Sequence, residues 1–136
     1  MHVALISFCP ARDGRSKEIL KRLEAASSSR GNRVDLIDGN SDIGSVRLTM
    51  FDYIAVVINS PGAFSARVPS RVRDFLAASG TIGGKKGCAL VIKSGFLSGK
   101  ACANLMETLE AEGVKLDYFD VIRSADHAAY AGTKIG

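Results

Sequence analysis

Short, continuously apolar runs alternate with amphipathic stretches along the chain, and this alternation restricts the fold more than any other feature. The apolar runs cover residues 3–6, 53–58 and 88–92, and two further strand-like runs that include polar residues cover 34–37 and 114–122. Runs this short and this apolar are typical of strands that are buried on both faces of a parallel sheet. The last run mixes polar with apolar residues, which predicts an edge strand.

The intervening stretches have helical periodicity. In residues 16–30 the apolar side chains recur at helical spacing, and Pro69 stands where a helix tolerates a missing N–H. Gly80 and Gly113 are placed to end the second and third helices. The apolar stripes are formed by Ile19, Leu20, Leu23 and Ala26, by Val72, Phe75 and Leu76, and by Cys102, Leu105, Met106 and Leu109.

Strands that alternate with helices predict an α/β fold with helices on both faces of the sheet. We expect one domain over residues 1–136, with a doubly wound, five-stranded parallel sheet in the order 2-1-3-4-5. Residues 125–136 are few and contain two glycines, so the last helix is expected to be short or missing. Its loss would leave the sheet thinly covered near residues 3–6, which predicts self-association as a homo-oligomer.

In a doubly wound sheet the ligand crevice opens at the carboxyl ends of the strands where the winding reverses. The loops at residues 7–16, 59–69 and 93–100 are therefore the candidate binding segments. The first places a glycine, two arginines and a serine before a helix start, a place that attracts anions. An ordinary capped helix with solvated arginines explains the same residues equally well.

The second and third loops each carry an aromatic residue where the chain is expected to be exposed. Phe64 lies between two prolines, and Phe96 follows a glycine turn. An exposed ring beside the crevice suits stacking on a planar ligand. The alternative is that Phe64 packs back onto the helix that begins at Pro69.

The middle of the chain resembles the central part of flavodoxins and of flavodoxin-like NAD(P)H:FMN or quinone reductases. The residues that carry the resemblance are Phe51-Asp52-Tyr53 and the apolar run after it, Ser60-Pro61, Phe64, Val68-Pro69 and Phe75-Leu76. Residues 7–20, with Gly14-Arg15-Ser16, are similar to their phosphate loop and first helix. Residues 94–113 are similar to their third loop, helix and closing glycine. The resemblance covers residues 2–122.

The resemblance implies a flavoprotein that binds FMN and acts in electron transfer or as a small NAD(P)H-dependent flavin or quinone reductase. The flavin would perform the redox chemistry itself, with NAD(P)H or a redox protein as partner, so no side chain is assigned a catalytic role. By this resemblance, the phosphate of FMN would be held by Arg12, Gly14, Arg15 and Ser16, with Ser7 and Cys9 in the same set. The flavin ring would lie between two groups of residues. One group is Pro61, Gly62, Ala63 and Phe64, and the other is Ser94, Gly95 and Phe96.

Two alternatives stay open. Cys9 and Arg15 form the pattern C-x5-R-S of low-molecular-weight phosphatases, with Asp126 as the only late candidate for a general acid. Against this, Pro10 lacks an N–H, and Asp13 would repel the incoming phosphate. The other alternative is an interaction module with this fold that has lost its flavin.

Composition excludes several classes of function. The net charge of +4 is spread along the chain without interleaved aromatics, so no nucleic-acid partner is expected. The apolar runs are too short to cross a membrane. The three cysteines show no spacing for a metal site and are expected to be reduced, with Cys88 and Cys102 in the core. A cytoplasmic location follows as the expectation.

Overall fold

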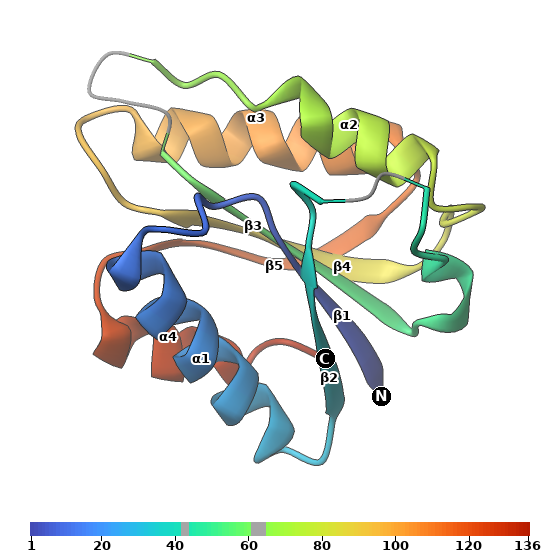
Figure 1. Cartoon of the computed structure of the whole chain (residues 1–136), viewed down its shortest axis with the longest axis horizontal. Helices are drawn as coiled ribbons and strands as arrows, with labels where there is room; N and C mark the ends of the chain where they lie inside the picture. The colour runs from blue at the N-terminus through green and yellow to red at the C-terminus, as the bar shows by residue number, and fades with distance from the viewer. Residues whose placement is uncertain (42–43, 61–64) are drawn as a thin grey trace.

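The computed structural model describes residues 1–41, 44–60 and 65–136. Its centre is a five-stranded parallel sheet in the order β2-β1-β3-β4-β5, which confirms the predicted α/β architecture (Figure 1). The strands are β1 (His2–Ser7), β2 (Arg33–Asp38), β3 (Tyr53–Asn59), β4 (Lys86–Ile92) and β5 (Lys115–Ile122). The helices are α1 (Gly14–Ser28), η1 (Leu48–Met50), α2 (Ser70–Ala77), α3 (Ser98–Ala111) and α4 (Ala125–Gly132).

The two faces of the sheet are covered by different helices. Figure 1 shows α1 and α4 on one face and α2 and α3 on the other. The first layer packs Val3 and Leu5 of β1 against Leu23 of α1 and Ala131 of α4. Because successive side chains of a strand point to opposite faces, Ala4 and Ile6 belong to the second layer, with Val72, Phe75 and Leu105.

The burial of the strands agrees with their sequence patterns. Every residue of β3 except Asn59 is buried, as expected of a central strand that is covered on both faces. The edge strand β5 alternates between exposed and partly buried residues, as its mixed polarity predicts. Among the described residues, no helix is both long and apolar enough to span a membrane.

The last helix is present and short, and it corrects one expectation from the sequence. Residues 3–6 of β1 are completely buried, so the sheet is not thinly covered there. Gly132 makes this coverage possible, because a Cβ at that position would lie 2.6 Å from the Cβ of Ala26 and 2.7 Å from the carbonyl oxygen of Leu23. Helices α1 and α4 therefore pack closely, and the reason given for self-association is wrong, although self-association itself stays a prediction.

Candidate functional site

The three candidate loops leave the same edge of the sheet, because all five strands run in one direction. They follow β1, β3 and β4, and Figure 1 shows the loops after β1 and β4 at the end of the molecule where α1 and α3 begin. In the sheet register Ser7 is aligned with Asp38 of β2 and with Val57 of β3. The crevice predicted at the reversal of the winding therefore lies at this edge.

The start of α1 is occupied by a carboxylate from the chain itself. Asp13 is the N-cap residue, and its Oδ1 accepts a hydrogen bond of 3.1 Å from the backbone N–H of Arg15. Its Oδ2 accepts a hydrogen bond of 2.6 Å from the hydroxyl of Ser16. That hydroxyl bond is the largest of the influences that hold the pKa of Asp13 below its ordinary value. The helix start thus binds an anion, as its free N–H groups and dipole favour.

Open space lies beside this cap. A Cβ built on Gly14 would meet no atom within 4 Å, whereas Ser16 is almost completely buried. Ser7, Cys9 and Ser16 all line a cavity of about 250 Å³ between this loop and the end of β2. The structure therefore brings three of the residues predicted for the phosphate, Ser7, Cys9 and Ser16, to one cavity.

Arg15 lies elsewhere than the resemblance implies. Its Nη1 donates to the carbonyl oxygen of Lys93 at 2.7 Å, and its Nη2 donates to the carbonyl oxygen of Arg123 at 3.1 Å. Those carbonyls follow the ends of β4 and β5. In this structure the guanidinium therefore ties two strand ends to α1 and is not turned toward the open space at Gly14. Arg12 is exposed and makes no side-chain hydrogen bond within the described part of the chain.

The loops after β3 and β4 are joined by serine side chains. The hydroxyl of Ser98 donates to Ser60 Oγ at 3.0 Å and accepts from the backbone N–H of Ser94 at 3.2 Å. The backbone N–H of Ser60 in turn donates to the carbonyl oxygen of Ile92 at 3.0 Å. Sequence reasoning missed Ser98, although a buried serine at a helix start next to a glycine turn is a recognisable signal.

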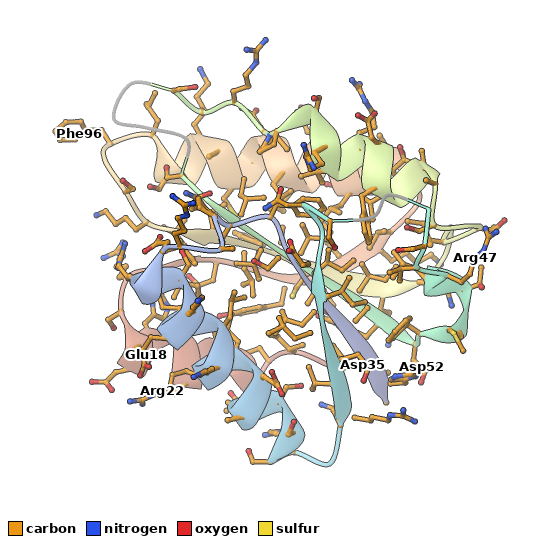
Figure 2. The ribbon with its side chains drawn as sticks, in the orientation of Figure 1. Glu18, Arg22, Asp35, Arg47, Asp52 and Phe96 are labelled. Atoms are coloured by element: carbon orange, nitrogen blue, oxygen red, sulfur yellow. The ribbon has the colours of Figure 1, made fainter. Side chains whose placement is uncertain are left out.

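Among the described residues, Phe96 is the most exposed large apolar one. It is 86% exposed, and Figure 2 shows its ring pointing away from the body of the protein at the tip of the loop after β4. Gly95, just before it, has a φ of 72°, a conformation that suits glycine. The predicted ring contacts at residues 61–64 lie outside the described residues.

The residues named for the phosphatase alternative are not arranged for that chemistry in the structure. Burial, with a smaller contribution from the charge of Asp13, raises the pKa of the Cys9 thiol despite hydrogen bonds from Ser7 and Ser16. A nucleophilic thiolate needs the opposite shift. Both terminal nitrogens of Arg15 are bound to carbonyl oxygens. The side chain of Asp126 is fully exposed and lies 4.0 Å from Arg22.

His127 and Asp120 form a second polar cluster, at the junction of β5 with α4. His127 Nδ1 accepts from the backbone N–H of Arg123 at 3.1 Å, so Nε2 is the donor to Asp120 Oδ2 at 2.9 Å. Both ring nitrogens are therefore used to hold α4 in place. Within the described ranges no group of three or more His, Cys, Asp or Glu residues is arranged to hold a metal ion.

The fold has many relatives among solved structures. No protein-family model matches the sequence, and no curated protein matches it. A flavodoxin from the domain Archaea superposes with a TM-score of 0.70 at 16% identity, covering 99% of this chain and 96% of that one. Flavodoxin 1 from Bacillus cereus gives 0.69 at 18%, covering 98% and 96%. The NAD(P)H:quinone oxidoreductase from Methanothermobacter marburgensis gives 0.69 at 16%, covering 98% and 95%. The chain therefore has the flavodoxin-like fold.

Proposed function

We propose that this chain binds FMN at the carboxyl edge of its sheet and uses it in electron transfer or as a small NAD(P)H-dependent flavin or quinone reductase. The observation that carries the proposal is the anion-binding start of α1, with open space at Gly14, on the same sheet edge as the exposed ring of Phe96. The similar folds of flavodoxins and of a quinone oxidoreductase support it.

The donors at the start of α1 fit a phosphate group. The backbone N–H of Arg15 and the hydroxyl of Ser16 already hold the carboxylate of Asp13, so the set is arranged for an anion. A phosphate would take over these donors and enter the space in front of Gly14, while Asp13 turns toward solvent. Asp13 then competes with the ligand, because its carboxylate is negatively charged at neutral pH and accepts hydrogen bonds from the same donors.

The other end of the ligand would lie at the loops after β3 and β4. Phe96 would cover one face of the ring, beside Ser94 and Gly95, and residues 61–64 are proposed for the other face. Ser98 and Ser60 hold the two loops at a fixed separation by their hydrogen bond. When bound, FMN supplies the redox chemistry, and the chain orients it and limits its contact with water.

A titration of FMN with the purified protein, followed by flavin fluorescence and the visible spectrum, tests the proposal. Wild type should quench the fluorescence and shift the spectrum. Gly14→Leu should weaken binding by at least about tenfold, because the new side chain fills the phosphate space. Gly83→Leu is the matched control, since a Cβ there also meets no atom within 4 Å and neither glycine has a positive φ.

Two results would overturn the proposal: no change in the flavin signal at saturating FMN, or equal loss of binding in both glycine variants. Asp13→Asn should bind FMN more tightly than wild type, because the competing charge is gone while the amide still caps the helix. If flavin binding is absent, the interaction module that the sequence left open becomes the better account.

A further inference from the structure

A wide groove lies between α2 and α3, away from the start of α1. Its volume is about 960 Å³. We call it the α2–α3 groove. The polar side chains that line it are Arg67, Ser70, Arg71 and Arg73 from the α2 side and Asn104, Glu107 and Thr108 from α3.

The charge of this groove is unbalanced. Three arginines line it, against a single acidic residue, Glu107, among the described lining residues. Neither Glu107 nor any of the three arginines forms an ion pair within residues 1–41, 44–60 and 65–136. A cluster of like charges without partners raises the local potential, and an anionic partner lowers it.

Several groups of the groove are held in place before any partner arrives. Arg71 Nη1 donates to the carbonyl oxygen of Asn40 at 2.7 Å, which fixes the position of this guanidinium. The amide nitrogen of Asn104 donates to the carbonyl oxygen of Ala66 at 2.9 Å, and Thr108 Oγ1 donates to the carbonyl oxygen of Asn104 at 3.0 Å. Side chains that are already ordered lose less entropy when a partner binds.

We propose that the α2–α3 groove docks an acidic segment of a partner protein. Carboxylates match the guanidinium fork of arginine, which binds them through two parallel hydrogen bonds. A nucleic acid fits less well, because none of the described residues that line the groove is aromatic and could stack on bases. This inference does not depend on bound flavin, since the groove contains none of the residues proposed for FMN.

A short fluorescein-labelled polyglutamate peptide serves as the probe, with fluorescence anisotropy as the readout. The triple variant Arg67→Glu, Arg71→Glu and Arg73→Glu should bind it at least about tenfold more weakly than wild type. The matched control reverses three exposed cations outside the groove and changes the net charge equally; its substitutions are Lys21→Glu, Arg30→Glu and Arg33→Glu. The control should stay within about threefold of wild type.

Three outcomes overturn the proposal: no binding of polyglutamate by wild type, equal weakening in both triple variants, or tighter groove-dependent binding of a single-stranded oligonucleotide of equal charge. If the groove variant does not fold, Arg67→Ala with Arg73→Ala replaces it, because neither side chain makes a hydrogen bond in the described part of the chain. FMN quenching by the groove variants should equal that of wild type, so failure of the two proposals is distinguishable.

Discussion

Replacing Arg15 with methionine tests whether its guanidinium links the strand ends to α1 or serves a phosphate. The side chain reaches the carbonyl oxygens of Lys93 and Arg123, which lie 78 and 108 residues further along the chain. Methionine keeps most of the aliphatic stem and removes the donors, so packing changes little. The variant therefore isolates the two hydrogen bonds.

The structure sets the size of the effect. A hydrogen bond that involves a charged group contributes about 1.5–3 kcal/mol when it is shielded from water. Arg15 is exposed, and water replaces the guanidinium at both carbonyls once it is removed, so each bond is worth about 0.5–1 kcal/mol here. We expect Arg15→Met to lower the free energy of unfolding by about 1–2 kcal/mol, a fall in Tm of about 3–8 °C.

Urea denaturation followed by circular dichroism, without added ligand, measures this change. Arg12→Met is the matched control, because Arg12 is an exposed arginine of the same loop without a side-chain hydrogen bond among the described residues. It should change stability by less than about 0.5 kcal/mol. Equal stability of the two variants, together with loss of FMN quenching in Arg15→Met alone, would refute the link to the strand ends and favour a phosphate contact.

Further predictions concern the loops, the α1–α4 contact and acid stability. Ser98→Ala should lower the free energy of unfolding by about 1–3 kcal/mol, because the buried polar groups that it binds lose their partner. A double-mutant cycle with Ser60→Ala should be non-additive, and additive effects would contradict the proposed coupling of the loops. Gly132→Val should lower the free energy of unfolding by at least about 1–3 kcal/mol, because the added atoms would clash with the backbone of Leu23. An unchanged Tm in thermal unfolding would contradict the close packing of α1 and α4. Burial raises the pKa of Asp120, but hydrogen bonds from neighbouring side chains outweigh it and hold the pKa below its ordinary value. The stability that Asp120 contributes is therefore present above its unfolded pKa and lost as the pH falls through the lower folded value. The Tm should drop below about pH 4 in wild type and less steeply in Asp120→Asn, whereas parallel curves would speak against this role.

The core elements could be predicted from the sequence because strands buried on both faces must be apolar at every position. The run at residues 53–58 became most of β3, and that at 88–92 became the carboxyl-terminal part of β4. Boundaries were less accurate. The first helix was expected over residues 16–30 and is found at Gly14–Ser28, because Asp13 caps it. An aspartate before a glycine is a capping signal that the apolar stripe alone does not contain.

The last helix shows a limit of pattern reasoning. The shortness of residues 125–136 and their two glycines suggested a short or missing helix that leaves the sheet thinly covered. In the structure Ala128 and Ala131 are buried and Gly132 allows close contact with α1, so small side chains give tight coverage. How closely two helices pack depends on which of their residues face each other, and the sequence of one helix alone does not reveal those pairs.

For the site, the sequence by itself determined which loops meet, because parallel strands carry their carboxyl ends to one edge. It also determined that a helix begins at this edge, with a glycine and a serine at its start that suit anion binding. Only the tertiary structure decided that Asp13 takes those donors and that Arg15 reaches the ends of β4 and β5. A long, flexible side chain chooses among partners that are distant in sequence, and those partners exist only once the sheet has formed.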